Sequence, residues 1–559
     1  MNLALIQEIQ QELPKIKTKK ELEKLKSVLS KKYKLNRNLS NIDLLSNIKN
    51  PDFKILLTKP VRTISGVTPI SIMSKPANCP SQAKCIYCPG GINSVFGNTP
   101  KSYPGNSPGI IRAIRNDYDP YLQVFNRLEH YVLLNHDITK VEFIVMGSTF
   151  LFFDNKYKED FIKFCLKALN DFSGLFVKNN QIDFGKFTDF FELPASIKDK
   201  ERIKRIKGKL LKLKSDTTLE KEQSRNENTY SRCVAMCLET RPDYSFEEHI
   251  SEMLMYGTTR VEIGVQTLSQ EIMEKIKRGH TTQDSIKATQ LLKDSFLKVT
   301  YHNMLNLTGS TIENDKYELK EIFENPDYRP DSLKIYPCLV FKGTELYDIW
   351  KQGNHKVFST EEIIDIICEA KKYIPKYCRI MRVNRDIPTF MSEAGVRKTN
   401  LRQYIDEELK KRKVKCSCIR CREPKLKQIS WENVKLLRQD YEASKGREIF
   451  LSYEDTKNDI LLGFVRLRIP YKQFRPEITN RSAGIRELHV YGQAVRIGEK
   501  DDNVQHKGLG ISLMQEAEKI AKEEYNVNKI LVISGIGVRN YYINKLGYKK
   551  DGPYVSKLI

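Results

Sequence analysis

Between residues 60 and 400 the chain repeats one pattern, a short apolar run followed by an amphipathic stretch. Six segments carry it: expected strands at 141–146, 234–238, 260–265 and 332–336, and expected helices at 159–169 and 282–292. Buried strands that alternate with helices form parallel sheets, because each helix carries the chain back to start the next strand. The pattern predicts an α/β fold, a partial (β/α) barrel, for residues 56–400.

The character of the chain changes after residue 432, where hairpin-like strands precede one strong amphipathic helix. The expected strands are 449–453, 460–468, 485–490 and 529–534, with helices at 509–524 and near Tyr541. These elements predict a mixed α+β domain over residues 432–559, which at about 130 residues has an ordinary domain size.

Residues 1–55 have the pattern of basic helices, with Leu22, Leu25, Leu29 and Tyr33 at helical spacing among lysines. Two interpretations fit this pattern equally. The segment is either an arm that contacts nucleic acid or a solvated helical cap on the next domain.

A second basic segment interrupts the repeated pattern at about 185–230. Residues 198–214 hold nine Lys or Arg, and residues 215–228 offer almost nothing to bury. We expect an exposed insertion that is helical at first and then loose. It is either an RNA contact or a solvated surface helix.

Net charge points to the kind of partner. The 94 Lys and Arg against 70 Asp and Glu give a formal charge of +24, which favours a polyanion such as nucleic acid over compositional drift alone. Twelve cysteines without an apolar leader favour an intracellular, most simply cytoplasmic, protein with reduced thiols. No run approaches the ~20 apolar residues of a membrane span, so we expect no membrane partner.

Cys79, Cys85 and Cys88 run into a Pro-Gly-Gly turn. Three thiolates hold three irons of a [4Fe-4S] cluster and leave the fourth iron open to a substrate. An open iron suits reductive cleavage of S-adenosylmethionine to a 5′-deoxyadenosyl radical. The alternatives are a zinc knuckle that lacks its fourth ligand, or a disulfide with a spare thiol.

Polar residues at the carboxyl ends of the expected strands define a second set of candidates. In parallel barrels this rim carries the active site. Gly147 and Ser148 follow the first strand after the cysteines and are expected to seat the amino group of S-adenosylmethionine. Glu239 and Gln266 are expected to line the same basin, and Lys334 is a candidate catalytic residue there.

A glycine-rich turn stands directly before the C-terminal amphipathic helix. Its residues are Gln505, His506, Lys507, Gly508, Leu509 and Gly510. Free N–H groups at such a helix start bind phosphates, and the turn resembles the pyrophosphate loop with which GNAT-family acetyltransferases bind coenzyme A. Tyr541 and Tyr542 stand where that fold places a tyrosine that can protonate the departing thiolate.

A third cysteine group, Cys416, Cys418 and Cys421, lies in a basic linker at 401–431. Its tight spacing is typical of a zinc knuckle, although the fourth ligand is not evident. The alternative is a basic turn without metal.

Motifs between these groups closely resemble the catalytic subunit of Elongator over about residues 55–559. They include segments 62–67, 73–76, 87–91, 239–244, 262–266, 385–388, 486–492 and 546–548. The resemblance implies a radical S-adenosylmethionine (radical-SAM) barrel, a zinc-type linker and a GNAT domain. It implies that the chain modifies C5 of the wobble uridine of tRNA.

In that reaction the adenosyl radical would take hydrogen from the methyl of acetyl-CoA. The carbon radical would add to C5, and thioester hydrolysis would leave a 5-carboxymethyl group. By resemblance, Cys79, Cys85 and Cys88 bind the cluster. Residues Glu487, Leu488, His489 and Val490 pair with pantetheine, Leu509 to Ile511 hold the pyrophosphate, and Tyr542 faces the thioester. The implied partners are tRNA and either other Elongator-type subunits or a second copy of the chain.

The chain departs from the family pattern at three places. Ser148 replaces a glycine, Val132 stands near where the family has a lysine close to acetyl-CoA, and residues 303–307 lose a proline and a glycine. Two further functions stay open. One is a protein lysine acetyltransferase with a structural cluster and Glu487 as its base, and the other is a non-catalytic tRNA-binding homologue.

Overall fold

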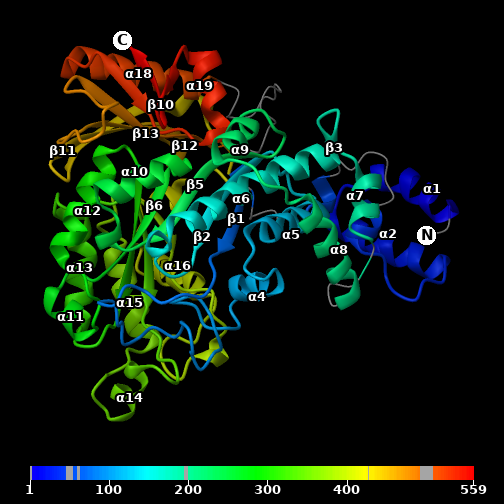
Figure 1. Cartoon of the computed structure of the whole chain (residues 1–559), viewed down its shortest axis with the longest axis horizontal. Coiled ribbons are helices and arrows are strands. Elements are labelled where there is room, and N and C mark those ends of the chain that lie inside the picture. The colour runs from blue at the N-terminus through cyan, green and yellow to red at the C-terminus, as the bar shows by residue number, and fades with distance from the viewer. Residues whose placement is uncertain are drawn as a thin grey trace.

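The computed structural model describes residues 3–45, 54–58, 63, 65–193, 195, 199–425, 427–491 and 508–559. Two seven-stranded sheets organise these residues. In Figure 1 the first sheet and its helices form the green and cyan body, the second sheet lies above it in orange and red, and the N-terminal helices extend to the right in blue.

The first sheet is parallel throughout and has the strand order β1-β2-β5-β6-β7-β8-β9. Its strands are β1 (Thr68–Met73), β2 (Lys140–Met146), β5 (Arg232–Thr240), β6 (Arg260–Gln266), β7 (Lys298–Leu305), β8 (Ser332–Pro337) and β9 (Arg379–Arg382). Because β1 and β9 do not pair, the sheet is a half-barrel with a lateral opening. The α/β prediction is confirmed, and the four predicted strands lie within β2, β5, β6 and β8.

Six helices pack on the outer face of this sheet: α5 (Pro120–Leu133), α6 (Asn155–Phe176), α10 (Glu247–Tyr256), α12 (Thr282–Asp294), α13 (Ile312–Glu324) and α15 (Thr360–Ala370). Helix α4 (Pro108–Arg115) lines the interior instead, and α11 (Gln270–Lys275) and α14 (Glu345–Lys351) pack with Ile86 at the rim. Successive residues of β6 alternate between the two faces of the sheet. Val261, Ile263 and Val265 are buried in the core under the helices, and the residues between them face the interior of the barrel. Burial of each such side chain contributes about 1.5–3 kcal/mol.

The N-terminal segment folds as α1 (Leu3–Glu12), α2 (Lys19–Lys32) and α3 (Asn41–Leu45). A capping box of Thr18 and Glu21 starts α2. The apolar faces of these helices form a cluster of their own, against which Phe184 packs. The N-terminal helices therefore have a small core of their own, which contacts the insertion through Phe184.

The prediction that the second half of the insertion is loose is wrong. The insertion contains α7 (Phe184–Phe190), α8 (Lys200–Leu213) and α9 (Leu219–Asn226), and the short strands β3 (Val177–Lys178) and β4 (Gln181–Ile182) precede it. Residues 215–228 are therefore not loose. Asn226 is completely buried and its amide oxygen accepts a 2.7 Å hydrogen bond from the backbone of Cys233 in β5, which fixes α9 against the half-barrel.

The linker and the second sheet complete the chain. The linker holds α16 (Leu401–Lys411) and α17 (Ile419–Arg422). The sheet has the order β10-β11-β12-β13-β14-β16-β15. Its elements are β10 (Val434–Ala443), β11 (Gly446–Asp455), β12 (Ile460–Ile469), β13 (Ser482–Val490), β14 (Lys529–Val532), β15 (Lys549–Asp551) and β16 (Tyr554–Leu558), with α18 (Leu509–Tyr525) and α19 (Arg539–Leu546). The predicted α+β arrangement is confirmed.

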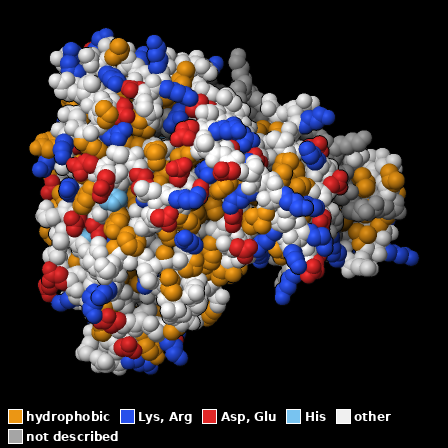
Figure 2. All heavy atoms as spheres, viewed as in Figure 1, with side chains coloured by type: hydrophobic (Ala, Val, Ile, Leu, Met, Phe, Trp, Pro, Cys, Tyr) orange, Lys and Arg blue, Asp and Glu red, His pale blue; other side chains and the backbone are white. Residues whose placement is uncertain are grey.

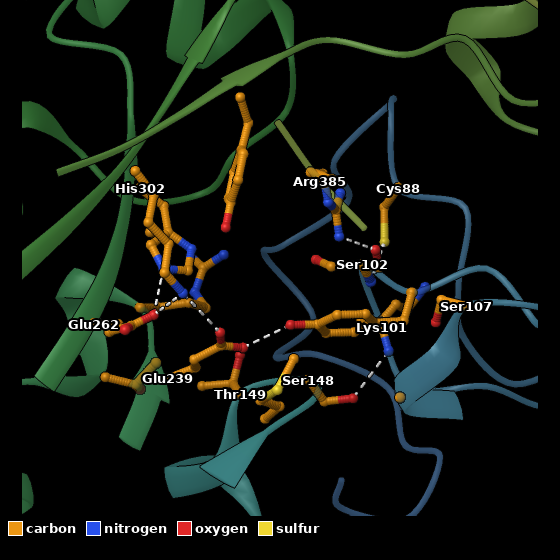
Figure 3. A pocket seen from close by; sticks show the side chains of 18 of the residues that line it. Cys88, Lys101, Ser102, Ser107, Ser148, Thr149, Glu239, Glu262, His302 and Arg385 are labelled. Carbon is orange, nitrogen blue, oxygen red and sulfur yellow. Dashed lines mark hydrogen bonds and ion pairs between the residues drawn. The ribbon is translucent and has the colours of Figure 1, made fainter. Parts of the chain in front are cut away.

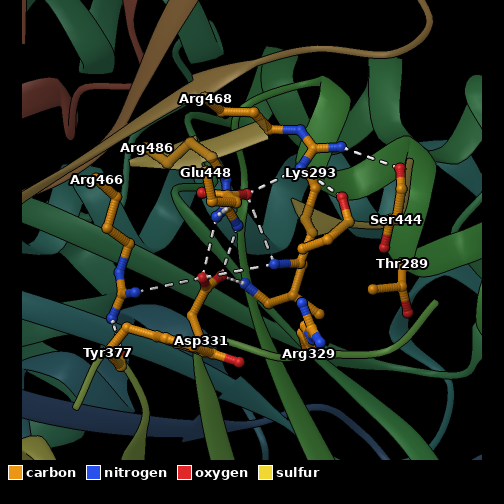
Figure 4. Close-up of polar contacts among 12 residues, drawn as sticks. Thr289, Lys293, Arg329, Asp331, Tyr377, Ser444, Glu448, Arg466, Arg468 and Arg486 are labelled. Carbon is orange, nitrogen blue, oxygen red and sulfur yellow. Dashed lines mark hydrogen bonds and ion pairs between the residues drawn. The ribbon is translucent and has the colours of Figure 1, made fainter. Parts of the chain in front are cut away.

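Buried charges join the two sheets (Figure 4). Asp331, directly before β8, pairs with Arg486 of β13, and Asp294 of α12 pairs with Arg468 of β12 at 2.6 Å. Glu448 of β11 receives hydrogen bonds from both arginines. Since these side chains are almost completely buried, the network fixes how the two sheets pack.

The outer surface mixes charges of both signs. In Figure 2, Lys and Arg side chains are interspersed with Asp and Glu over the face that is shown, so the positive charge of the chain is not gathered into one patch on that face. Among the described residues, no helix has both the length and the apolar character required to cross a bilayer.

Candidate active site

A cavity of about 1400 Å³ occupies the interior of the half-barrel. It extends from the predicted cysteines and Gln266 at the carboxyl ends of the strands to Glu142 and Arg260 near their amino ends. Inward-facing side chains of β1, β2, β5, β6, β7 and β8 line it, and Figure 3 shows its polar residues converging from several strands. The parallel sheet thus gathers residues that are far apart in the sequence.

Cys79, Cys85 and Cys88 lie on one loop at the rim of this cavity, and all three are free thiols. Each sulfur has a donor from another segment. Thr149 Oγ1 lies 3.7 Å from Cys79 Sγ, Arg278 Nη1 lies 3.6 Å from Cys85 Sγ, and the Ser102 N–H lies 3.2 Å from Cys88 Sγ. Donors around each sulfur suit thiolate ligands.

The geometry of these cysteines disfavours both the disulfide and the zinc knuckle. All three thiols are free, which argues against a disulfide. Four thiolates on one zinc ion lie within about 4 Å of one another, given Zn–S bonds of about 2.3 Å. Within the described parts of the chain, Cys79, Cys85 and Cys88 do not gather within 4.8 Å, whereas Cys416, Cys418 and Cys421 do. The wider spacing fits a cluster in which each thiolate binds a different iron.

Gly147 and Ser148 directly follow β2, and Ser148 Oγ donates to the carbonyl of Ala77, two residues before Cys79. Gly147 has a φ of 100°, and a Cβ there would lie 2.8 Å from the sulfur of Met73. Ser148 Oγ accepts a 3.1 Å hydrogen bond from the Lys101 N–H and lies against the cavity. These residues therefore form the wall where S-adenosylmethionine is expected. Ser148, which stands where the family has a glycine, has a φ of 52°, in the left-handed region that favours glycine.

Lys334 lies at the centre of a polar network inside the barrel. Its ammonium contacts the carboxylate of Glu262 and lies 3.5 Å from Glu239 Oε1. His302 Nε2 lies 2.7 Å from Glu262 Oε2, and Tyr103 Oη donates to Glu239 at 2.8 Å. The predicted residues Glu239, Gln266 and Lys334 thus share one cavity.

Protonation states follow from these contacts. Burial disfavours the charged form of Lys334, but Glu262 and other neighbours outweigh it and raise its pKa. Burial would raise the pKa of Glu262, yet Lys334 and Arg260 hold it well below its usual range. Burial and Lys334 lower the pKa of His302, which leaves its imidazole neutral at neutral pH.

Sequence reasoning did not assign roles to Glu262, His302, Tyr103 or Arg278. Strand alternation could have identified Glu262 and His302. Glu262 lies four residues before the predicted Gln266 on β6, and His302 lies two residues before Met304 on β7, which lines the cavity. Tyr103 and Arg278 reach the site from loops, and no local pattern identifies them.

Strand β13 has an unpaired edge beyond Ile485, which we call the groove. It pairs in parallel with β14 only as far as Ile485 and Val532, where β14 ends. The register with β12 shifts at the same level, where Arg466 faces Glu487 and Leu467 faces Ile485, so Arg486 is the extra residue of a bulge in β13. The unpaired part of β13 holds the predicted residues Leu488, His489 and Val490.

Helix α18 starts at the end of this groove. Gly508 is its N-cap, with a φ of 74°, and Leu509, Gly510 and Ile511 form its first turn. An α-helix of 17 residues presents free N–H groups there. The predicted residues Gln505 and Lys507 lie outside the described residues.

Tyr541 and Tyr542 point to different places. A Cβ built on Gly510 would lie 3.5 Å from the hydroxyl of Tyr541 and close to Val490 and Leu488, so this hydroxyl lies at the groove. Tyr542 is 7% exposed and packs against Tyr548 in the core. The hydroxyl of Tyr541 therefore lies beside the start of α18, whereas Tyr542 lies in the core.

Glu487 does not have the environment of a general base. Its carboxylate contacts Lys298 and accepts a 2.9 Å hydrogen bond from Arg466 Nε. Burial alone would raise its pKa, but these two cations lower it to about 2. A carboxylate this acidic takes a proton poorly, which argues against the lysine acetyltransferase interpretation.

Cys416, Cys418 and Cys421 converge as predicted, with the sulfurs of Cys418 and Cys421 3.5 Å apart. The N–H of Ile419 donates to the carbonyl of Cys378, which fixes α17 to the start of β9. The described residues add no His or carboxylate to this group.

Two departures from the family pattern have structural explanations. Val132 lies on the buried face of α5, where it is 3% exposed, and does not line the cavity. In the altered segment, Asn306 donates to the carbonyl of Lys356 and accepts from the N–H of Phe358. The changed loop is thus held by hydrogen bonds of its own.

Comparison with protein families gives two adjacent matches. The Radical SAM superfamily matches residues 77–317, and the Radical_SAM C-terminal domain matches residues 330–411. Both matches fall on the half-barrel and the start of the linker.

Individual proteins resemble nearly the whole chain. A tRNA uridine(34) acetyltransferase of Methanocaldococcus jannaschii is 45% identical over 99% of this chain and 97% of its own length. Elongator complex protein 3 of Saccharomyces cerevisiae is 41% identical over 95% of this chain and 90% of its own. The solved structure of the archaeal Methanocaldococcus infernus Elp3 has 43% identity and a TM-score of 0.71, and it covers 89% of this chain and 100% of that chain.

Proposed function

Because this chain belongs to the family of tRNA uridine(34) acetyltransferases and Elongator complex protein 3, we propose that it modifies C5 of the wobble uridine, U34, in tRNA. The expected product carries a 5-carboxymethyl group derived from acetyl-CoA. The observation that carries this proposal is that a half-barrel lined by Cys79, Cys85 and Cys88 is joined to the sheet of β13 by the buried ion pair of Asp331 and Arg486.

Cys79, Cys85 and Cys88 would hold a [4Fe-4S] cluster, with S-adenosylmethionine on the open iron. When bound, this pair supplies a 5′-deoxyadenosyl radical. Ser148, Glu239 and Gln266 line the adjoining wall and would orient S-adenosylmethionine through polar contacts. Thr149, Ser102 and Arg278 would stabilise the thiolate charge by donating to the sulfurs.

The groove of the second sheet suits acetyl-CoA. The N–H groups at Leu509 to Ile511 would bind the pyrophosphate at the positive end of α18. The unpaired edge of β13 at Leu488 to Val490 would pair with the pantetheine amides. The Tyr541 hydroxyl would protonate the thiolate that leaves during hydrolysis.

The lateral opening of the half-barrel suits entry of an RNA loop. Arg112 lines the cavity on the β1 side, and Arg382, Arg385 and Arg420 line it on the β9 side. Guanidinium groups on both sides can contact phosphates while a single base enters the cavity. The yeast relative is named as part of the Elongator complex. The native mass of this chain distinguishes a monomer from a homodimer, and activity of the isolated chain tests whether it depends on further subunits.

We also assign zinc to Cys416, Cys418 and Cys421, because thiolates within 4.8 Å of one another match the dimensions of a zinc site. The ion would hold α17, and hence Arg420, at the wall of the cavity.

Nucleoside analysis of tRNA tests the function. Reduced, iron-reconstituted protein is incubated with tRNA, S-adenosylmethionine and acetyl-CoA, and we expect 5-carboxymethyluridine at position 34. Cys85→Ala should abolish the product, and Cys165→Ala, in the buried core of α6, should retain it. Carboxymethyluridine formed by the Cys85→Ala variant would refute the radical route, and acetylated lysine as the sole product would refute the tRNA assignment.

A further inference from the structure

The segment that follows α11, residues 276–279, packs directly against the cysteine loop. The Lys84 N–H donates to the carbonyl of Lys277 at 3.1 Å, and the Ile86 N–H donates to the carbonyl of Ile276 at 3.2 Å. These two hydrogen bonds lie on either side of the central cysteine of the loop. The segment is therefore placed to act on that cysteine through its side chains.

Arg278 extends from this segment to a position between Cys85 and β6. Its Nη1 lies 3.6 Å from Cys85 Sγ, and its Nη2 donates a 2.8 Å hydrogen bond to the carbonyl of Gly264. The backbone is fixed as well, because the Arg278 carbonyl accepts a 3.0 Å hydrogen bond from Arg241 Nη1. The guanidinium is thus held in one place, where it joins the cysteine loop to the strand that carries Gln266.

Arg278 is a buried cation that lacks a carboxylate partner. The residue is 8% exposed, and no Asp or Glu among the described residues forms an ion pair with it. The neighbouring Arg241, in contrast, contacts both oxygens of Asp243. Burial of a charge is very unfavourable unless an opposite charge lies nearby. The partner of Arg278 that can carry a negative charge is the sulfur of Cys85, as a thiolate.

The three cysteines of the loop differ in the donors that they receive. Among the described residues, only the sulfur of Cys85 receives a charged donor. Cys79 faces the hydroxyl of Thr149, and Cys88 faces the backbone N–H of Ser102. Charge-assisted hydrogen bonds are roughly twice as strong as neutral ones. The donor at Cys85 is therefore the strongest electrostatic influence among the three.

Hydrogen bonds to the sulfurs and nearby charges set the reduction potential of an iron–sulfur cluster. The reduced form carries one more negative charge than the oxidised form. A fixed cation beside a ligand sulfur stabilises the reduced form more, and the low exposure of Arg278 strengthens this effect.

We propose that Arg278 is the counter-ion of the Cys85 thiolate and raises the reduction potential of the cluster. This inference rests on the proposed [4Fe-4S] cluster and adds the residue that makes its reduction more favourable. One electron enters the cluster from an external one-electron reductant. Arg278 acts through Cys85 and not on the reacting atoms, so it is a positioning residue.

Gly264 leaves the space that the guanidinium occupies. A Cβ there would lie 2.6 Å from Arg278 Nη2 and 2.6 Å from Gln266 Nε2. Both atoms are ends of side chains, so Gly264→Ala should keep the backbone of β6 in place and displace the guanidinium from Cys85. This variant retains the positive charge and loses the contact.

The reduction potential of the reconstituted protein tests the inference without turnover. Redox titration followed by EPR is carried out without S-adenosylmethionine or tRNA, and iron and sulfide analysis gives the cluster content. In Arg278→Met the equilibrium constant for one-electron reduction should fall about 10-fold, the size of one charge-assisted hydrogen bond, which lowers the midpoint potential by about 59 mV. Gly264→Ala should shift it in the same direction, and Arg278→Lys should lie between Arg278→Met and the wild type.

Lys275→Met is the matched control. Lys275 lies three residues before Arg278, at an exposed position of α11, and pairs with Glu271 at 2.6 Å. Its replacement removes the same charge, but solvent and salt screen an exposed charge. The midpoint potential should therefore stay at the wild-type value.

The outcomes separate this inference from the proposed function. A wild-type midpoint potential in Arg278→Met and Gly264→Ala would overturn the role of Arg278 and leave the proposed function standing. An equal shift in Lys275→Met would show a general effect of net charge and overturn the contact with Cys85. If Arg278→Met assembles no cluster, the potentials of Gly264→Ala and Arg278→Lys decide. Failure of the wild type to assemble a cluster would overturn the radical route, and the role of Arg278 with it.

Discussion

Arg486 of β13 and Asp331, directly before β8, form an ion pair without exposed surface, with Nη2 2.5 Å from Oδ2 and Nη1 3.0 Å from Oδ1. Strand β13 borders the groove and β8 carries Lys334, so one buried pair joins the two halves of the candidate site. Burial would raise the pKa of Asp331, but Arg486 and Lys293 hold it well below its usual range.

Loss of one partner of this pair should destabilise the protein. Arg486→Met leaves the Asp331 carboxylate with fewer partners in a buried site, and we expect the free energy of unfolding to fall by about 3–5 kcal/mol. Urea denaturation measures the effect. Arg438→Met, which breaks an exposed ion pair, should change it by less than about 1 kcal/mol. Equal effects of the two variants would contradict the assigned role.

Lys293, in the same network, predicts how stability depends on pH. Burial lowers its pKa to about 8, despite Asp331 and Glu448. The unfolded side chain titrates near 10.4, so between pH 8 and 10 the unfolded state binds more protons and wild-type stability rises with pH. Lys293→Met lacks this rise, and the stability of the wild type relative to the variant should increase by up to about 3 kcal/mol from pH 7 to 10. Urea denaturation of both proteins measures this difference in the free energy of unfolding. A difference that is the same at pH 7 and pH 10 would refute the prediction.

The network around Lys334 predicts a change at His302. Burial and Lys334 lower the pKa of His302, so Lys334→Met should raise it. Titration of isotope-labelled imidazoles by NMR measures this change in the metal-free protein. His355, whose pKa is lowered by burial alone, serves as the internal reference and should not move. An unchanged His302 would show that Lys334 does not act on it electrostatically.

Tyr541 and Tyr542 should differ in catalysis. Tyr541→Phe removes the hydroxyl at the groove, and thioester hydrolysis should slow by about 100-fold, a usual loss for a general acid. Tyr542→Phe keeps the core packing, and the rate should stay within about twofold. Release of coenzyme A, followed with a thiol reagent, compares the two. The reverse order of effects would assign the thioester to Tyr542.

Cys418→Ser should remove zinc from the linker. Metal analysis should find about one zinc per wild-type chain and none in the variant, since a structural site needs its full set of ligands. Chelation of the wild type should lower its thermal midpoint, because the ion stabilises only the folded state. Cys165→Ala is the matched control and should retain zinc. Zinc that remains in Cys418→Ser would place the ion elsewhere.

Local patterns in the sequence were sufficient for the elements and for the residues that lie close together along the chain. The run Arg260 to Val265 alternates inward and outward residues within a strand, and Cys79, Cys85 and Cys88 occupy one loop. The glycine-rich start of α18 is equally local. Such features depend on interactions between near neighbours, which composition and spacing express directly.

The prediction of a loose segment at 215–228 was wrong because the contacts that hold this segment come from residues distant in the sequence. Residues Leu219 to Asn226 have little apolar content, and their helix is held by contacts with α6 and β5 that are distant in sequence. Polar residues such as Asn226 can be completely buried when their hydrogen bonds are satisfied.

Sequence by itself determined the partial barrel, the mixed second domain and the two cysteine groups, because strand period, helix starts and ligand spacing are properties of short segments. Only the tertiary structure decided that Tyr541 reaches the groove and that Glu487 is neutralised by Lys298 and Arg466. These outcomes depend on which side chains the folded chain brings within a few ångströms, and on the burial that makes their charges interact strongly.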